Sequence, residues 1–250
     1  MSLDGASAAT YEALRPGADF PRVTRQVAAL CAGKRALGRE RPEVALLFMK
    51  MRPNIAELPA LVELAASLGV DRVNATNLDF TPDRAVAGLS LIAPGSPSPE
   101  ITDALQRAGQ RARELNLPFR DLSLNLADDL LVCDANPLDN VLVTASGRLA
   151  PCVYLGLPVA GDFSRLFMQR SRPAQNYFYG SIRDLDFQEI RQQPAYQDFT
   201  AVFRRRLRGK VNLMDCVASY GRTSTPKAPP VLERFPWPPA CQGCYKTLGL

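Results

Sequence analysis

Hydrophobic and polar residues alternate with two different periods in the first half of the chain. Apolar positions three and four residues apart predict helices, and short continuous apolar runs predict buried strands. Helices are expected over residues 7–15, 19–38, 54–69 and 98–115. Strands are expected over residues 43–50, 70–79 and 118–124. Strands that alternate with helices in this way predict a parallel sheet joined by crossover helices.

Polar residues mark where two of these helices begin. Asp19 precedes the second helix, where its carboxylate can accept hydrogen bonds from the first turn. Asn54, with Glu57 three residues later, follows the logic of a capping box at the start of the third helix. Gly69 is expected to end that helix.

The pattern changes after residue 126. Residues 140–144 and 149–154 predict the two strands of a β-hairpin, with a Ser-Gly pair at its turn. A helical stretch is expected over residues 184–208, and Pro- and Ser-rich irregular chain over 217–240. The second half therefore lacks the alternation of strands and helices that the first half shows.

Composition narrows the class of protein. The chain has 250 residues, of which 46% are hydrophobic and 22% charged, as is usual for a soluble globular protein. No apolar run approaches the roughly 20 residues of a membrane helix, and the chain does not open with a secretory signal, so a cytoplasmic protein is expected. The sequence contains no His, which excludes Ser-His-Asp triads, Cys-His proteases and His-ligated zinc or haem.

The mildly basic charge of +5 includes a run of arginines from Arg204 to Arg208, followed by Lys210. This run ends the helix predicted over residues 184–208, and cations at a helix C-terminus are stabilised by the helix dipole. A solvated helix end is therefore the first interpretation, and an acidic peptide partner the second. Nucleic-acid binding is disfavoured because interleaved aromatic residues and a known nucleic-acid fold are missing.

Four cysteines form the candidate chemical site. Cys133 and Cys152 flank the predicted hairpin, and Cys241 and Cys244 form a C-x-x-C. A tight turn lets both sulfurs of a C-x-x-C face one metal, and the hairpin can bring the other two to the same place. Four soft thiolates suit either zinc or an iron–sulfur cluster, and the number of ligands does not separate the two.

The other two cysteines are expected to lie outside this site. Disulfides are the less favoured use of cysteine in a cytoplasmic chain. Cys31 lies on the apolar face of a predicted helix, which indicates a core thiol. Cys216 is interpreted as a structural or spare thiol.

The hairpin cysteines carry a family resemblance. Cys133, Gly147 and Cys152 follow the spacing C-x13-G-x4-C, which is similar to the opening motif of SPASM domains. These domains are the C-terminal extensions of radical S-adenosylmethionine enzymes. The segments that resemble later parts of such a domain are residues 179–182, 186–190 and 196–199. Residues 2–15 and 48–58 resemble the fourth and fifth strands of the family's barrel with the helices that follow them.

The chain also departs from this family. A complete SPASM domain has a third cysteine after five more residues beyond its C-x-x-C, and that position in this chain is Leu250. Four cysteines hold one cluster, as in the shorter twitch type. The C-x-x-x-C-x-x-C loop of the S-adenosylmethionine-cleaving cluster does not occur in the sequence and is expected upstream of residue 1. The chain thus resembles the C-terminal two-thirds of such an enzyme, as a fragment or a natural split protein, and is not expected to cleave S-adenosylmethionine alone.

The resemblance further implies residues near S-adenosylmethionine. Ser2 and Asp4 are expected to face that cofactor, Arg15 to pair with a carboxylate, and Asn77 to lie at the face of the barrel where active sites form. Ordinary structural roles remain open at this point. Asp4 can cap a turn, Arg15 can be a surface charge, and Asn77 can be a turn residue.

The overall expectation is an α/β protein of two domains. Residues 1–126 are expected to form a partial (β/α)6 barrel containing its later strands, and residues 127–250 a small α+β domain of the SPASM or twitch type. The resemblance implies one auxiliary [4Fe–4S] cluster, S-adenosylmethionine in the complete enzyme, and a role in peptide or protein modification. Its expected partners are the missing N-terminal barrel half and a peptide or protein substrate. The alternative is a structural or interaction module with a four-thiolate zinc site.

Overall fold

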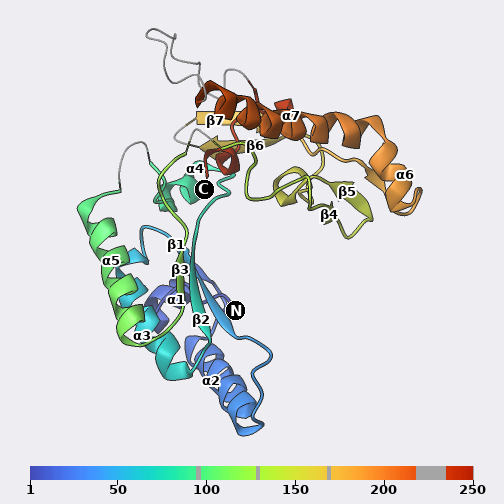
Figure 1. Ribbon diagram of the computed structural model, residues 1–250. Helices are drawn as coiled ribbons and strands as arrows, with labels where there is room; N and C mark the ends of the chain where they lie inside the picture. The colour runs from blue at the N-terminus through green and yellow to red at the C-terminus, as the bar shows by residue number, and fades with distance from the viewer. Residues whose placement is uncertain (94–96, 128–129, 168–169, 218–234, 250) are drawn as a thin grey trace. The chain divides into compact units, whose positions relative to one another are not determined.

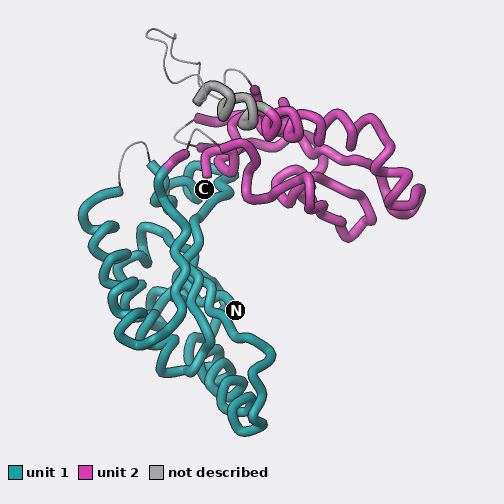
Figure 2. The backbone as a smooth tube through the Cα atoms, in the orientation of Figure 1, with its two compact units in different colours: residues 1–125 teal, residues 126–250 magenta. Residues whose placement is uncertain are grey.

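The chain is organised as two compact units. The computed structural model describes residues 1–93, 97–127, 130–167, 170–217 and 235–249, with no account of the side chains of 209–217. Unit 1 spans residues 1–125 and unit 2 residues 126–250 (Figure 2). The described residues form a mixed α/β structure with small sheets and no closed barrel, which confirms the α/β class. Within them, no helix is long and apolar enough to cross a membrane.

Unit 1 is built on three parallel strands (Figure 1). Its strands are β1 (Ala45–Lys50), β2 (Arg72–Asn77) and β3 (Phe119–Asp121). Its helices are α1 (Ala8–Leu14), α2 (Phe20–Ala36), α3 (Leu58–Leu68), α4 (Arg84–Leu89) and α5 (Pro99–Glu114). The strand order is β1–β2–β3, with Leu46 opposite Val73 and Ala75 opposite Asp121. The predicted parallel sheet is confirmed. Helix α4 was not predicted, because its six residues are too few to show a helical period in the sequence.

One face of this sheet carries the core of unit 1. Leu46 and Phe48 of β1 are fully buried, as are Val73 and Ala75 of β2. These side chains belong to one cluster with apolar residues of α2, α3 and α5. Leu47 points the other way and is 39% exposed. Side chains alternate between the two faces of a strand. The buried residues therefore mark the face that the helices cover, and Leu47 marks a second face that is partly open.

Most of the predicted helix boundaries in unit 1 agree with the structure to within one or two residues. The Asp19 carboxylate accepts a hydrogen bond of 2.8 Å from the N–H of Arg22, which confirms this residue as the cap of α2. Helix α3 ends at Gly69, whose φ of 76° lies in the left-handed region. Gly69 therefore ends the helix as expected, because glycine adopts this conformation without strain.

The predicted capping box at Asn54 and Glu57 is wrong. Residues 55–57 form a 3-10 turn ahead of α3, and the Asn54 side chain makes no cap bond. Asn54 is instead fully buried, with its Oδ1 accepting from the N–H of Met51 at 2.8 Å. Its Nδ2 donates to the carbonyls of Asp4 at 3.0 Å and Met49 at 2.9 Å. The side chain thus ties β1 to the N-terminal segment, a contact that local sequence does not reveal.

Glu57 also serves the N-terminal segment rather than its own helix. Its carboxylate accepts from the N–H groups of Ala6 at 2.7 Å and Ser7 at 3.2 Å. It also accepts from the hydroxyls of Ser7 at 2.9 Å and Thr10 at 2.5 Å. Burial acts to raise the pKa of Glu57, but the hydrogen bonds from Thr10, Ala6 and Ser7 outweigh it and hold the pKa below its usual value. The charged carboxylate therefore fixes the start of α1.

Unit 2 contains small antiparallel sheets and two helices. Its strands are β4 (Leu142–Val143), β5 (Arg148–Ala150), β6 (Phe163–Phe167), β7 (Arg170–Ala174) and β8 (Gly180–Ser181). Its helices are α6 (Phe187–Gln192) and α7 (Pro194–Val217). β4 and β5 form the predicted hairpin, with Gly147 at its turn at a φ of 83°. β5 also pairs with β8, and β6 pairs with β7, neither of which the sequence pattern indicated.

Two predictions for this half need correction. The single helix expected over residues 184–208 is two helices, because Pro194 begins a new one. Since α7 continues to Val217, the run from Arg204 to Arg208 lies inside the helix, and its interpretation as a helix end is wrong. Of the irregular chain expected over 217–240, residues 218–234 lie outside the described residues.

Aromatic rings fill the core of unit 2. Tyr196, Phe199 and Phe203 follow helical spacing on α7 and are buried. The rings of Tyr179 and Tyr196 lie 4.8 Å apart, those of Phe199 and Phe203 5.5 Å, and those of Phe203 and Trp237 5.8 Å. These contacts connect the strand side of the unit to its C-terminal segment, and offset aromatic pairs add to the stabilisation from burial.

We expect Glu57→Ala to destabilise unit 1 by about 2 kcal/mol, because several donors lose a charged acceptor. The contribution of Glu57 is fully present above the ordinary glutamate pKa and is lost as the pH falls through the lowered folded-state pKa. Urea unfolding followed by far-UV circular dichroism at pH 7 and at acidic pH measures both effects. Glu63→Ala, which removes an exposed pair with Arg111, is the control and should cost less than about 1 kcal/mol. Equal losses for the two variants would contradict this role of Glu57.

Candidate functional site

The four cysteines of the predicted site line one cavity in unit 2. Cys133, Cys152, Cys241 and Cys244 all border a cavity of about 20 Å³. Cys152 precedes the 3-10 turn η2 (Val153–Leu155) that follows the hairpin. The C-x-x-C joins the turns η3 (Pro239–Cys241) and η4 (Tyr245–Leu248). The fold therefore gathers sulfurs from three distant parts of the sequence, while their role as ligands stays a prediction.

Backbone amides lie near the two hairpin sulfurs. The N–H groups of Ala135 and Asn136 act to lower the pKa of Cys133, and those of Tyr154 and Leu155 act to lower the pKa of Cys152. The N–H of Asn136 also donates to the carbonyl of Cys133 at 2.9 Å, and that of Leu155 to the carbonyl of Cys152 at 3.1 Å. A donor aimed at a thiol stabilises its thiolate form, which is the form that binds metals. The turns after both cysteines thus favour the ligand state.

The C-x-x-C is held by a tight turn. The N–H of Cys244 donates to the carbonyl of Cys241 at 3.1 Å. Between them, Gly243 has a φ of 73° in the left-handed region. A Cβ at Gly243 would lie against the side chain of Arg172, so the position is also crowded. Glycine therefore suits this turn on both counts, and the turn brings Cys241 and Cys244 to the same cavity.

Burial strongly favours the neutral form of these thiols. It raises the pKa of Cys152 to about 11, with the N–H of Tyr154 acting in the opposite direction. Burial and the neighbouring Cys244 also raise the pKa of Cys133, and that of Cys241 lies well above its usual value for the same two reasons. Without a cation in the cavity the raised pKa values keep the thiols of Cys133, Cys152 and Cys241 protonated at neutral pH. Metal binding would release these protons, so the affinity for a metal should rise with pH.

Two buried cationic side chains border the same cavity. Arg165 is 4% exposed and donates to the carbonyls of Tyr154 at 2.5 Å and Ala240 at 3.4 Å. Its Nε is buried and has no hydrogen-bond partner among the described residues. Lys246 is 7% exposed and forms an ion pair of 3.0 Å with Asp134. The cavity is therefore lined by four potential anions and two cations.

A third cation, Arg206, lies close to the site. It is fully buried on α7 and donates to the carbonyls of Leu131 at 2.9 Å and Leu130 at 2.6 Å, and to that of Phe235. Its guanidinium carbon lies 3.6 Å from the centre of the Trp237 ring. Burial lowers the pKa of Arg206, whereas its electrostatic interactions with Cys133 and Cys241 raise it. The side chain thus joins three segments around the cysteines.

Sequence reasoning missed these cations for different reasons. The run from Arg204 to Arg208 suggested a solvated surface, although Arg206 follows Phe199 and Phe203 at helical spacing and so shares their buried face. That periodicity was the available signal. Arg165 lies in β6, which the sequence pattern did not predict. No local signal indicated its position.

The other two cysteines, Cys31 and Cys216, are not part of the described site. Cys31 is fully buried in the core of unit 1, as its helical spacing predicts. Cys216 lies in α7, and its side chain is outside the described residues. Of the described cysteines, Cys31, Cys133, Cys152, Cys241 and Cys244, none forms a disulfide.

In unit 1, the structure brings together two of the residues implied to lie near S-adenosylmethionine. Asp4 is 3% exposed, and its Oδ2 accepts from Nε of Arg15 at 2.6 Å. Its Oδ1 accepts from the N–H of Met49 at 2.8 Å. Arg15 thus pairs with a carboxylate, and this pair attaches the N-terminal segment to β1. The contact explains the burial of Asp4 without a cofactor, so a cofactor role stays a prediction.

The remaining two residues lie apart, Ser2 in the N-terminal segment and Asn77 at the end of β2. Ser2 is exposed and forms a parallel bridge with Leu47 in the middle of β1. Asn77 is the last residue of β2, at the carboxyl end of the parallel sheet. Its Nδ2 donates to the carbonyl of Ser123 at 2.8 Å, and its buried Oδ1 has no partner among the described residues. Asn77 therefore keeps one acceptor at the end of the sheet where ligands of parallel sheets bind.

The thiols do not form a site for a single ion. Among the residues that the structure describes, no group of three or more Cys, Asp or Glu side chains has an arrangement that could hold one metal ion. Comparison with protein-family models, curated proteins and solved structures finds no match to this chain.

We expect Arg206→Ala to destabilise unit 2 by about 3 kcal/mol, because three backbone carbonyls lose their donor and the Trp237 ring loses its stacking partner. Trp237 is the single tryptophan of the chain, so its fluorescence reports the unfolding of this unit. The control is Arg205→Ala, an exposed neighbour on the same helix, which should change the unfolding free energy by less than about 0.5 kcal/mol. A similar, small effect of both variants would show that Arg206 is dispensable.

Proposed function

We propose that unit 2 binds one [4Fe–4S] cluster through Cys133, Cys152, Cys241 and Cys244. The observation that carries this proposal is the convergence of four thiols on one cavity, three of them buried and that of Cys152 partly buried. Thiolates are the usual ligands of such clusters, and four of them complete the coordination of one cluster. When bound, the cluster would supply one-electron transfer.

The choice of a cluster over a zinc ion rests on the spacing of Cys133, Gly147 and Cys152, which resembles that of SPASM domains, because the number of thiolate ligands does not separate the two. The cavity of about 20 Å³ has room for about one water molecule, so binding a cluster would require the cysteine turns to move apart. The buried Nε–H of Arg165 is a donor without a partner among the described residues, and cluster sulfurs accept such hydrogen bonds. Structural zinc is the competing result of the experiment below.

The protein's own groups prepare this cavity for negative charge. Arg165 and Lys246 border it, and Arg206 interacts electrostatically with Cys133 and Cys241. Because the site is buried, these cations act with little screening by water. Arg165 also holds the Tyr154 and Ala240 carbonyls, next to two of the cysteine turns. Its role is to position those turns and to balance the charge of four thiolates.

The same proposal assigns unit 1 to the later part of a radical S-adenosylmethionine barrel. Its parallel strands with helices on one face support this assignment, because the second face needs a cover that the described residues do not supply. Ser2, Asp4, Arg15 and Asn77 are the residues proposed to lie toward S-adenosylmethionine in the complete enzyme. The cluster that cleaves this cofactor would be held by another segment or chain, and the reaction would modify a peptide or protein.

We expect each of the substitutions Cys133→Ser, Cys152→Ser, Cys241→Ser and Cys244→Ser to remove most of the bound iron, because a hydroxyl replaces a soft thiolate. Iron and acid-labile sulfide are measured per chain after anaerobic purification. Cys31→Ser is the matched control, since that thiol lies in the core of unit 1, and it should keep the iron content of the unsubstituted chain. Retention of iron by Cys133→Ser, or its loss in Cys31→Ser, would show that the ligand set is wrong.

We expect Arg165→Gln to shift the reduction potential of the cluster to a more negative value, because removing a nearby cation destabilises the more negative reduced state. A redox titration followed by electron paramagnetic resonance measures the shift. Arg170→Gln, an exposed position on the neighbouring strand, is the control and should leave the potential unchanged. Arg165→Lys keeps the charge and should recover most of the shift. Equal potentials in Arg165→Gln and the control would rule out the electrostatic role.

A further inference from the structure

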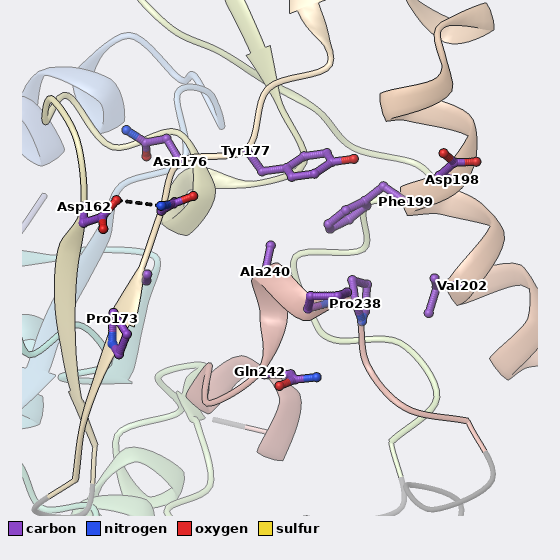
Figure 3. Close-up of a pocket in the computed structure, with 13 residues that line it drawn as sticks. Asp162, Pro173, Asn176, Tyr177, Asp198, Phe199, Val202, Pro238, Ala240 and Gln242 are labelled. Carbon is purple, nitrogen blue, oxygen red and sulfur yellow. Dashed lines mark hydrogen bonds between the residues drawn. The ribbon is translucent and has the colours of Figure 1, made fainter.

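A second, larger cavity in unit 2 lies beside the cysteine site and is open to solvent. Its volume is about 730 Å³, within the usual range of ligand pockets. Three segments form its walls: the ends of the β6–β7 hairpin, the first turns of α7, and the chain leading to the C-x-x-C. Figure 3 shows side chains from all three segments around one hollow. We call it the α7 groove.

The inner wall of the α7 groove is apolar and rigid. Tyr177 and Phe199 have ring centres 5.1 Å apart, and Pro238 lies below them in Figure 3. The hydroxyl of Tyr177 donates to the carbonyl of Ala195 at 3.0 Å, which fixes the ring. Val202 completes this wall from the next turn of α7. These side chains offer an apolar surface, and their aromatic faces also attract cations.

Two carboxylates lie on opposite sides of the groove. Asp162 precedes β6, and its Oδ1 accepts from Nε2 of Gln175 at 2.7 Å. Asp198 lies on α7, and within the described residues it has neither a hydrogen bond nor an ion pair through its side chain. Figure 3 shows the two carboxylates on either side of the Tyr177 and Phe199 rings. Among the described residues that line the groove there is no Lys or Arg, so this described lining is locally anionic.

This local charge opposes that of the whole chain. The chain carries a formal net charge of +5, so its average field repels cations and attracts anions. Two aspartates, with no Lys or Arg in the part of the lining that the structure describes, therefore create a local preference for cations that the overall charge does not. An apolar wall between two carboxylates complements a segment with apolar residues between two cationic side chains.

We propose that the α7 groove docks an extended segment of a partner protein in which Lys or Arg residues flank apolar residues. The aliphatic stems of Lys and Arg pack on apolar surface while their charged ends reach a carboxylate. Asp162 and Asp198 each receive one cation, and the rings with Pro238 receive the apolar residues between them. Exposed ion pairs contribute modestly, so apolar burial provides the affinity and the carboxylates provide the selectivity.

The groove adjoins the cysteine site but does not depend on the identity of its metal. Ala240 borders both cavities, and Gln242 of the C-x-x-C turn lines the groove. A docked segment would therefore lie next to the loop that carries Cys241. This docking proposal is separate from the cluster proposal. It rests on the aspartates and apolar side chains of the groove, and no cysteine is among the described lining residues.

The test is fluorescence anisotropy with labelled five-residue peptides and the purified full chain. One peptide has lysine at both ends and leucine, proline and leucine between them, and its matched control has glutamate at both ends. We expect saturable binding of the lysine peptide that weakens as salt is added, and at least tenfold weaker binding of the glutamate peptide. Iron is measured in the same samples, so loss of the cluster and loss of peptide binding are recorded separately.

The variants locate the site. Asp162→Asn with Asp198→Asn should weaken binding of the lysine peptide about tenfold, since two exposed ion pairs are lost. Asp184→Asn, an exposed aspartate of unit 2 outside the groove, should leave binding unchanged. Circular dichroism confirms that the variants fold. Failure of the lysine peptide to bind, equal binding of both peptides, or equal effects of the groove and control variants would overturn the proposal.

Discussion

The energetic cost of burying four thiols together is the constraint on which unit 2 depends. Burial raises the pKa of Cys133, Cys152 and Cys241, that of Cys152 to about 11, so their thiolate forms are disfavoured without a cation nearby. Arg165 and Lys246 border the same cavity, where Arg165 donates to two backbone carbonyls and Lys246 pairs with Asp134. A positively charged centre would offset the cost of charging the thiols, because thiolates would become its ligands.

The same constraint explains how so small a unit keeps its shape. Its sheets have two or three short strands, which give limited stabilisation by themselves. The segments around Cys133, Cys152 and the C-x-x-C are far apart in the sequence and meet at the cavity. Arg206 donates hydrogen bonds to the carbonyls of Leu130 and Leu131, and Phe203 of α7 packs against Trp237, so both connect these segments to α7. Metal binding is therefore expected to stabilise unit 2 further, beyond the apolar core that its aromatic rings form.

The sequence predicted those elements whose structure depends on residues close to one another in the chain. Helix α3 with its Gly69 end, the parallel strands and the hairpin around Gly147 all follow from periodicity and backbone conformation. The spacing of the cysteines likewise indicated a common site. What failed depends on distant partners. Glu57 binds a segment 50 residues away, and Arg206 is buried only because Trp237 and three carbonyls from other segments surround it.

The central claim is that the four thiols bind a [4Fe–4S] cluster, and metal analysis of the intact chain tests it most directly. The chain is purified without oxygen, and iron, acid-labile sulfide and zinc are quantified against protein concentration. The account predicts about four iron and four sulfide per chain, little zinc, and a brown colour that fades in air. One zinc per chain without sulfide, or a folded unit 2 that binds no metal, would contradict it.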